Sequence, residues 1–397
     1  MNILIINTFY YPNMVGGAEH SVKLLAENLV KAGNCVSVYT LDGDGNKSEG
    51  MIGEIINGVM VYRGHDMYFD REKHFNPQGI DEKILCRLSS FQNRRIKRDL
   101  DYLQVHMKPD VVHVNNIYGI SSYVWQYFHN HNVKVIYTIR DYFLLDPKAR
   151  IGGTKGIILK LYQAYFRKKS CKYVDIVTAP SEFTLGVFTK NGYFKNARKK
   201  CVVNSIIFDA KDVLRDIEEK NSRNSNKIIF LFVGALTHDK GVDNLIKAFQ
   251  TVKNENICLW LCGNGPLKNL VKEAQVKDER ICYKGQVASE KLSQIYREAD
   301  VLIAPSTWDE PFGRIIIEGN QYGLVVIGSN KAGIAEILNY MKTGETINPD
   351  SITEIASKID NFSKREYYQR YVENIMPNLS RYSVKNQIDD FIALYNS

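Results

Sequence analysis

Runs of apolar, β-branched residues alternate with amphipathic helical patterns along the whole chain. In the first half the strand-like runs lie at 2–7, 35–41, 59–63, 110–116, 134–139, 175–180 and 200–205. In the second half they lie at 228–236, 257–263, 281–286, 301–306 and 324–329. Helical patterns lie between them, for example at 242–253 and 290–299. This alternation predicts an α/β protein with parallel sheets.

The two series of strands are separated by a polar stretch, RDIEEKNSRNSNK, at 215–227. Because 397 residues are too many for one ordinary core, we expect a domain on each side of this linker, at 1–214 and 228–379. The final segment, 380–397, has apolar residues at helical spacing and predicts a helix over 383–396. Two doubly wound halves would bind ligands at the carboxyl ends of their strands, in a cleft where the halves face one another.

Composition narrows the class of protein. Hydrophobic residues make up 44% and charged residues 24%, as in soluble globular proteins. No apolar run approaches the roughly 20 residues of a membrane span, and the N-terminus is typical of a strand rather than a leader, so we expect a cytoplasmic protein. The seven cysteines are scattered without a CxxC pair, which indicates neither a zinc site nor a disulfide framework.

A net charge of +8, from 52 basic and 44 acidic residues, favours an anionic partner. The chain has no nucleic-acid motif, which leaves phosphorylated substrates or an anionic membrane face. The segment 154–173 predicts a helix whose apolar residues lie beside a basic end, and 93–100 adds positive charge. Such a surface would suit anionic lipid, at the inner face of the cell membrane. A helix packed on its sheet with a solvated basic face explains the pattern equally well.

Three turns after strands contain glycines that would let a ligand approach the backbone. The segment GNG, at 263–265, has two glycines but lacks the third glycine of the dinucleotide fingerprint. This argues against a dehydrogenase. In the second domain Lys240 would add a point charge for a phosphate. The glycines of the three turns are Gly16 and Gly17, Gly234, and Gly263 and Gly265.

The stretch STWDEPFGRIIIEGNQYGLVVI, at 306–327, contains two carboxylates separated by seven residues. Pro311 suits the first position of a helix with Glu310 as its cap, which would leave free amides near Phe312 and Gly313 for an anion. Glu318 would lie about 12 Å further along a regular helix, at about 1.5 Å per residue. A nucleotide diphosphate sugar has about this reach, with one acid on the sugar, the amides on the phosphates and the other acid on the ribose.

The same stretch, continued to GSNKAGIAEIL and taken with GGAEH and FVGALTHDKGVDNLIKAF, resembles the retaining family-4 glycosyltransferases of GT-B fold, over nearly the whole chain. The resemblance implies two Rossmann-like domains facing across a cleft, with the donor held mostly by the C-terminal domain and the acceptor by the N-terminal one. It also implies that no metal or cofactor is needed and that the C-terminal helix packs back on the N-terminal domain.

Carried over by position, Glu310 matches the acid that binds the transferred sugar, Glu318 the ribose ligand and Lys240 the lysine on the diphosphate. Phe312 and Gly313 match the backbone amides near the phosphates. Glu336 lies where the family has the acid of GGIPE, and we expect an indirect role for it. The five turn glycines match the donor-contacting loops. For the acceptor, the resemblance leads us to expect three residues of the first domain, His113, Asn115 and Asp141.

Three positions depart from the family pattern. Ala235 replaces an arginine on the diphosphate, and Ala332 replaces a glycine near the sugar. Arg140 replaces a histidine that contacts the transferred sugar near the reaction centre. We therefore expect Arg140 to take part in catalysis, to favour an acidic sugar, or to mark lost activity.

The sequence thus predicts a retaining glycosyltransferase that moves a hexose-type sugar from a UDP- or GDP-linked donor to an oligosaccharide or lipid-linked acceptor in polysaccharide biosynthesis. A sugar-nucleotide epimerase or a disaccharide synthase of the same fold is one alternative. A non-catalytic subunit that binds a sugar nucleotide is another, supported by Arg140 and Ala235.

Overall fold

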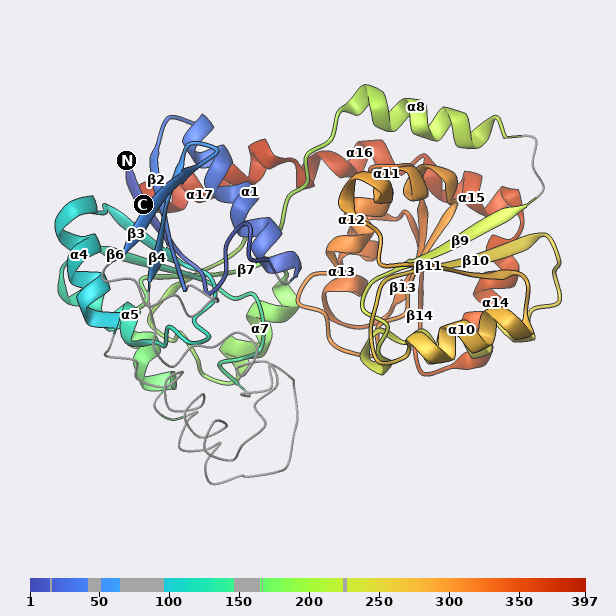
Figure 1. The fold of residues 1–397 in the computed structure, drawn as a ribbon, viewed down its shortest axis with the longest axis horizontal. Helices are drawn as coiled ribbons and strands as arrows, with labels where there is room; N and C mark the ends of the chain where they lie inside the picture. Colours follow the sequence, from blue (N-terminus) through green and yellow to red (C-terminus); the bar gives the residue numbers. More distant parts are fainter. Residues whose placement is uncertain (15, 42–50, 65–95, 146–164, 166, 224–226) are drawn as a thin grey trace. The chain divides into compact units, whose positions relative to one another are not determined.

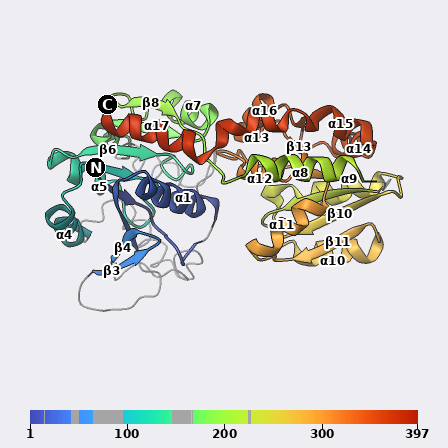
Figure 2. The same cartoon turned by 90° about the horizontal axis from the view of Figure 1, so that it is seen from above.

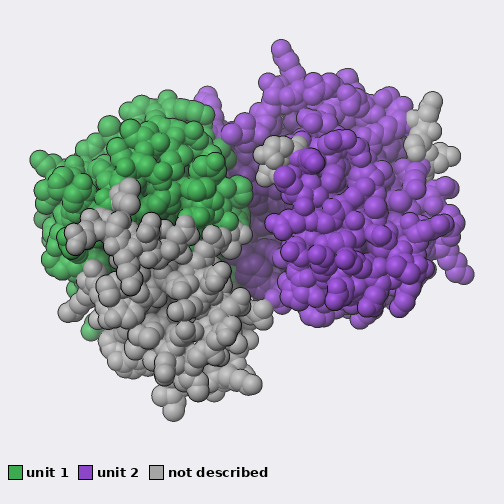
Figure 3. Space-filling model, in the orientation of Figure 1, with its two compact units in different colours: residues 1–203, 387–397 green, residues 204–386 purple. Residues whose placement is uncertain are grey.

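The computed structural model describes residues 1–14, 16–41, 51–64, 96–145, 165, 167–223 and 227–397. The chain divides into two compact units, which Figure 3 shows in green and purple. Unit 1 comprises Met1–Val203 with Gln387–Ser397, and unit 2 comprises Asn204–Asn386. Each unit is an α/β layer structure with its own sheet, as the alternating pattern predicted (Figure 1).

Unit 1 contains an eight-stranded sheet in the order β3-β4-β2-β1-β5-β6-β7-β8. Every neighbouring pair is parallel except β3–β4, which is a hairpin. The strands are β1 Asn2–Ile6, β2 Cys35–Leu41, β3 Ile52–Ile56, β4 Val59–Gly64, β5 Val111–Val114, β6 Lys134–Thr138, β7 Ile176–Ala179 and β8 Arg198–Cys201.

The strands inside the sheet of unit 1 are mostly buried and apolar. Strands β5 and β7 have no exposed residue, as expected when helices cover both faces of a parallel sheet. Seven of its strands were predicted, and β3 was missed because a five-residue edge strand containing a glycine and a glutamate has little apolar signal. The described helices of unit 1 are α1 Gly17–Lys31, α4 Lys97–Met107, α5 Tyr123–Asn130, the 3-10 turn η2 Cys171–Tyr173, α7 Glu182–Lys190 and α17 Val384–Asn396.

Unit 2 contains a six-stranded sheet in the order β11-β10-β9-β12-β13-β14, with all neighbours parallel. Its strands are β9 Ile228–Val233, β10 Ile257–Cys262, β11 Ile281–Gly285, β12 Val301–Ala304, β13 Val325–Ser329 and β14 Gly344–Ile347. Strand β14, of sequence GETI, was not predicted because only its last residue is buried. In this order β9 and β12 are neighbours at the centre, so the turns that follow them lie together.

The helices of unit 2 surround this sheet. Two predicted helices are confirmed almost to the residue, at 242–251 and 289–298. The described helices are α8 Ala210–Asn221, the 3-10 turn η3 His238–Lys240, α9 Val242–Thr251, α10 Lys268–Lys277, α11 Ser289–Glu298, α12 Arg314–Asn320, α13 Ala332–Met341, α14 Ile352–Phe362, α15 Arg365–Val372, α16 Ile375–Leu379 and the 3-10 turn η4 Ser380–Tyr382.

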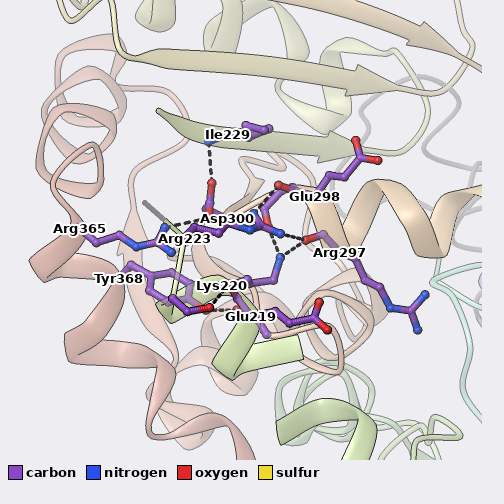
Figure 4. Close-up of polar contacts among 12 residues, drawn as sticks. Glu219, Lys220, Arg223, Ile229, Arg297, Glu298, Asp300, Arg365 and Tyr368 are labelled. Carbon is purple, nitrogen blue, oxygen red and sulfur yellow. Dashed lines mark hydrogen bonds and ion pairs between the residues drawn. The ribbon is translucent and has the colours of Figure 1, made fainter. Parts of the chain in front are cut away.

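The polar segment 215–227 is not a linker, as the sequence had suggested. Residues up to Asn221 belong to helix α8, which is part of unit 2, and the boundary between the units lies at 203/204. The prediction failed because two of the three buried residues of α8, Asp216 and Lys220, are charged, and only Val213 is apolar. Lys220 is fully buried and donates hydrogen bonds to the carbonyls of Tyr296 and Arg297, at 3.1 and 2.6 Å, and to that of Ala299 (Figure 4).

These carbonyls belong to the last turn of α11, where a helix has no internal donors for its final oxygens. Arg223 donates to the carbonyl of Glu298 at 2.8 Å, and Asp300 accepts from the amide of Ile229 at 3.0 Å and from Arg365 at 3.0 Å (Figure 4). Two charged residues of the supposed linker, Lys220 and Arg223, therefore cap α11. Composition alone does not distinguish such a segment from a solvated connection.

The C-terminal helix α17 packs on the sheet of unit 1, and residues 387–397 cluster with that unit (Figures 1 and 2). Its buried residues include Ile388, Phe391 and Tyr395, and Gln387 donates to the carbonyl of Val203 at 2.7 Å. This confirms the expected return of the last helix to the N-terminal unit.

Candidate functional site

The turns at the carboxyl ends of β9 and β10 in unit 2 are shaped by glycines. Gly263 has φ +146°, and a Cβ atom on it would lie 1.8 Å from the carbonyl oxygen of Gly234. The amide of Gly234 in turn donates to the carbonyl of Cys262 at 3.0 Å. A Cβ on Gly265 would lie 2.5 Å from the carbonyl oxygen of Leu236. The two turns therefore pack backbone against backbone, and side chains are excluded from their interface.

Lys240 and Glu310, 70 residues apart in the chain, form an ion pair beside these turns. Lys240 ends η3, after β9, and Glu310 follows β12. Ser306 donates to the same carboxylate oxygen at 3.3 Å, and the Lys240 ammonium lies 5.3 Å from the centre of the Trp308 ring. The pairing places a cation and a carboxylate at the carboxyl edge of the sheet, where the topology predicts a ligand site. Ser306 and Trp308 were missed, although both flank Glu310 in the quoted motif.

The helix after Glu310 begins later than predicted. Its first residue is Arg314, and Gly313 is the preceding residue, with φ +95°, a left-handed conformation that favours glycine. Glu310 is therefore not a helix cap and Pro311 is not the first helical residue, so the regular-helix distance to Glu318 does not apply. The carbonyl of Glu310 instead accepts from the amide of Gly333 at 2.9 Å.

Phe312 is buried, and its ring lies 6.1 Å from that of Tyr382. Its backbone passes so close to Gly333 that a Cβ there would lie 2.6 Å from the Phe312 carbonyl oxygen. The residue before Gly333 is Ala332, which has φ +48° at the start of α13. A glycine would meet no steric penalty in this conformation, so the alanine adds local strain. Glu336 lies further along α13.

Glu318 is not bonded to the Lys240–Glu310 pair. Within α12 it accepts from Nε of Arg314 at 2.6 Å, an i,i+4 pair, and Arg314 also donates to the carbonyl of Ser205 at 3.3 Å. Its side chain keeps 29% of its surface exposed. A ligand can therefore reach Glu318.

Unit 1 has a polar cluster at the carboxyl ends of β1, β5 and β6. Arg140 donates through Nε and Nη2 to Oδ1 of Asn115, at 3.0 and 2.8 Å, and Asn115 is fully buried. Asn116 donates to Asp141 at 3.3 Å and accepts from Thr8 at 3.1 Å. Three predicted residues, Arg140, Asn115 and Asp141, are therefore brought to one sheet edge. The signal for the missed Asn116 is its place directly after β5.

The electrostatics of this cluster are those of partly desolvated acids. Burial raises the pKa of Asp141, and the nearby carboxylate of Glu19 raises it further, against the hydrogen bond from the amide of Phe143. Glu19 is itself buried in the first turn of α1, where it accepts from the amide of Gly16 at 2.8 Å. Asp141 is thus easier to protonate than an exposed aspartate.

The sequence suggested that the Gly16–Gly17 turn needs the conformational freedom of glycine. The structure shows that it does not. Gly16 has φ −159°, an extended conformation that any residue can adopt, and Gly17 is the first residue of α1. A Cβ on Gly16 would have Glu19 as its nearest neighbour, at 3.7 Å. What these glycines provide is an uncovered backbone at the helix start.

His113, predicted as an acceptor residue, lies in the core of unit 1. It is fully buried, with Nδ1 2.8 Å from the hydroxyl of Tyr395 and Nε2 2.6 Å from that of Thr138. Desolvation, with a smaller effect of the Arg140 charge, lowers the pKa of His113 to about 3, so the ring is neutral. It links β5 and β6 to helix α17. The prediction was wrong because strand periodicity does not tell which helix covers a face.

Much of the proposed membrane helix, 154–164 and Phe166, lies outside the described residues, as do 93–95 of the second basic segment. Within the described ranges no helix is long and apolar enough to cross a bilayer. Among the residues that the structure describes, no three or more His, Cys, Asp or Glu side chains lie close enough together to hold a metal ion.

Comparison with known proteins assigns each half of the chain to a family model. Residues 15–204 match Glycosyltransferase Family 4, and residues 214–376 match Glycosyl transferases group 1. An uncharacterized 42.6 kDa protein in the cps region of Klebsiella pneumoniae is 29% identical over 348 residues, covering 85% of this chain and 87% of the relative. An uncharacterized glycosyltransferase of Methanocaldococcus jannaschii is 26% identical over 391 residues, covering 94% and 92%.

Solved structures agree on the fold. Sucrose-phosphate synthase from Thermosynechococcus elongatus has a TM-score of 0.77 at 19% identity, covering 99% of this chain and 98% of that one. Anabaena HepE, solved in complex with UDP, has a TM-score of 0.69 at 16% identity, covering all of both chains. With a family model matching each domain and this fold throughout, the chain belongs to the family-4 glycosyltransferases of GT-B fold.

Proposed function

We propose that this protein transfers a hexose-type sugar from a UDP- or GDP-linked donor to an oligosaccharide or lipid-linked acceptor during polysaccharide biosynthesis, on the cytoplasmic side of the cell membrane. The observation that carries the proposal is the ion pair of Lys240 and Glu310 beside the glycine turns of unit 2. The cps-region relative supports the polysaccharide context, and the UDP complex of HepE supports the kind of donor.

In this proposal Lys240 binds the diphosphate and Glu310 binds hydroxyls of the transferred sugar. The uncovered turns at Gly234, Gly263 and Gly265 let the donor lie against the backbone. Further donor contacts come from the amides of Phe312 and Gly313, the Glu318 carboxylate and the Gly16–Gly17 turn. In unit 1 Arg140, held by Asn115, and Asp141 are the polar groups nearest the acceptor.

The reaction retains the configuration of the sugar without a protein nucleophile or a metal. The bond between the anomeric carbon and the phosphate oxygen breaks, the acceptor oxygen bonds to the same face, and the leaving phosphate takes the acceptor's proton. The protein supplies orientation and a cation for the charge that develops on the diphosphate. Lys240 is already held in place by Glu310, so little reorganisation is needed when the donor binds.

The test is nucleotide release from a panel of sugar nucleotides, with and without lipid-linked oligosaccharide acceptors. We expect Lys240→Ala and Glu310→Gln each to lower turnover by about 100-fold or more, the typical loss on removing one group that stabilises transition-state charge. Lys358→Ala and Glu345→Gln are matched controls, because these residues form an ion pair of similar exposure elsewhere in unit 2. Controls should turn over normally.

Wild-type turnover by the Lys240 and Glu310 variants would remove the site assignment. Binding of a sugar nucleotide without release under any acceptor condition would favour the alternative of a non-catalytic binding subunit.

A further inference from the structure

The positive charge of the chain is concentrated in one segment. Residues 165–200 contain nine lysines and arginines and two acidic residues, a net charge of +7, whereas the whole chain carries +8. Eight of the nine cations are exposed, and Arg167 is buried. The remainder of the protein is therefore nearly neutral, and its electrostatic attraction for polyanions comes from this segment.

The fold gathers these cations around β7 and β8, the last two strands of the sheet of unit 1: five lysines precede one of the two strands, and Arg198–Lys200 lie within β8. Lys168 precedes β7, Lys195 precedes β8, and both lie against Gly192, where a Cβ would be 2.9 Å from Nζ of Lys168 and 3.4 Å from Cε of Lys195. Lys199 donates to the carbonyl of Lys195 at 3.3 Å. We name this surface the basic end; its residues are Lys168, Lys169, Lys172, Lys190, Lys195, Arg198, Lys199 and Lys200.

The positive charges of the basic end are not neutralised by carboxylates of the described residues. Among the described residues, none of its eight cations forms an ion pair with a carboxylate. Of the two acids in the segment, Asp175 accepts from the amide of Val135 at 2.7 Å, and Glu182 lies at the opposite end of α7 from Lys190. Lysines on an exposed edge strand such as β8 prevent edge-to-edge aggregation. That function explains Arg198–Lys200 but not the five lysines of the preceding segments.

The chemistry of the basic end favours a diffuse anionic surface over a shaped polyanion. Seven of the eight cations are lysines, which act as point charges, whereas arginine is the residue suited to bidentate recognition of single phosphates. Of the aromatic residues beside the basic end, Tyr193 and Phe194 are buried, and the Lys172 ammonium lies 4.7 Å from the centre of the half-buried Tyr173 ring. Tyr165 is exposed, but one ring is not the row of aromatic side chains on which successive bases stack. A membrane leaflet rich in anionic lipid needs neither groove nor stacking.

We propose that the basic end is the surface through which this protein docks on an anionic membrane. The inference rests on the proposed function for the identity of the partner, the membrane that carries the acceptor, and it locates the contact in described residues. Five of the eight cations lie at the amino ends of β7 and β8 and three lie within β8, whereas Arg140 and Asn115 follow the carboxyl ends of β6 and β5 in the same sheet. Docking therefore leaves the polar cluster of unit 1 uncovered.

The experiment is co-sedimentation of the full chain with vesicles of phosphatidylcholine alone or mixed equally with phosphatidylglycerol, at low and high salt. The test variant replaces Lys169, Lys190, Lys195 and Lys200 by Gln. The matched control replaces Lys247, Lys253, Lys272 and Lys277, four exposed lysines of unit 2, by Gln. Each cation near an anionic leaflet contributes roughly a fivefold factor to partitioning, so we expect the test variant, which lacks four of them, to bind about 600-fold more weakly than the wild type.

The control variant and the wild type should bind the anionic vesicles equally, and salt should release both. Failure of the wild type to bind anionic vesicles at low salt would overturn the proposal, as would equal binding by the test variant. Binding to a soluble acidic polysaccharide but not to vesicles would overturn it in favour of a polyanion site. Donor binding by the test variant, measured with UDP and GDP, reports on the proposed function separately, because none of the four lysines belongs to the candidate site.

Discussion

The buried Lys220 makes the stability of unit 2 depend on pH in a predictable direction. Lys220 is fully buried beneath α11, and its three hydrogen-bond acceptors are neutral backbone carbonyls. Desolvation by burial, together with the repulsion from Arg223, lowers the pKa of Lys220 to about 7. In the unfolded chain the same ammonium has its ordinary pKa of about 10.5.

The unfolded state therefore binds more protons than the folded state between these two pKa values. The free energy of unfolding must rise with pH in this window, and the contribution is lost as the pH falls toward 7. Between pH 7 and pH 8.5 the difference in proton binding integrates to on the order of 1 to 2 kcal/mol from this one residue. The rise is readily measurable, because single substitutions typically change stability by a similar amount.

The perturbation is Lys220→Met, which keeps the length of the side chain but removes the titrating group. We expect the wild type to gain on the order of 1 to 2 kcal/mol of stability between pH 7 and pH 8.5, and the variant to gain almost none. The assay is urea unfolding at a series of pH values, with hydrogen exchange of α11 amides to report on unit 2 directly. Lys272→Met, at an exposed lysine of α10, is the control and should retain the wild-type dependence on pH.

A wild type and a Lys220→Met variant with the same dependence on pH would refute the reasoning, since the buried lysine would then not be the group that titrates. A variant that is less stable than the wild type at every pH would not refute the reasoning, because the carbonyls of α11 lose their hydrogen-bond donor in that variant.

Three further predictions concern the core and the backbone of the site. The neutral, buried His113 has its pKa lowered to about 3, so the wild type should lose on the order of 1 to 2 kcal/mol of stability between pH 6.5 and pH 5, and His113→Gln should reduce that loss in urea titrations. Ala332→Gly should raise the urea midpoint by the equivalent of about 1 kcal/mol, because it removes a left-handed alanine; a lowered midpoint would contradict this. Gly241→Ala should destabilise by about 2 kcal/mol more than Gly285→Ala in the same assay, since both have positive φ but only the first places a Cβ 2.0 Å from the carbonyl oxygen of Pro305. Equal losses of stability in the two variants would show that the Pro305 carbonyl can move to make room for a side chain at position 241.

The pattern of apolar residues determined the number and order of most strands, because burial on both faces of a parallel sheet demands long β-branched runs. It also determined the two units and the C-terminal helix. The edge strands β3 and β14 were not predicted because each pairs on one side only and has few buried residues. Helix α8 was not predicted because two of its three buried residues are charged, one of them Lys220, which caps another helix.

For the candidate site, the spacing of the motifs indicated Lys240 and Glu310, but only the tertiary structure decided that the two side chains form an ion pair, since β9 and β12 are adjacent in the sheet and distant in the chain. The same adjacency of non-consecutive segments placed His113 under Tyr395 and removed it from the site. Local sequence determines which segment forms a strand or helix through periodicity. Which faces those elements cover depends on contacts between residues far apart in the chain, and these contacts decide whether a polar side chain serves the core or a ligand.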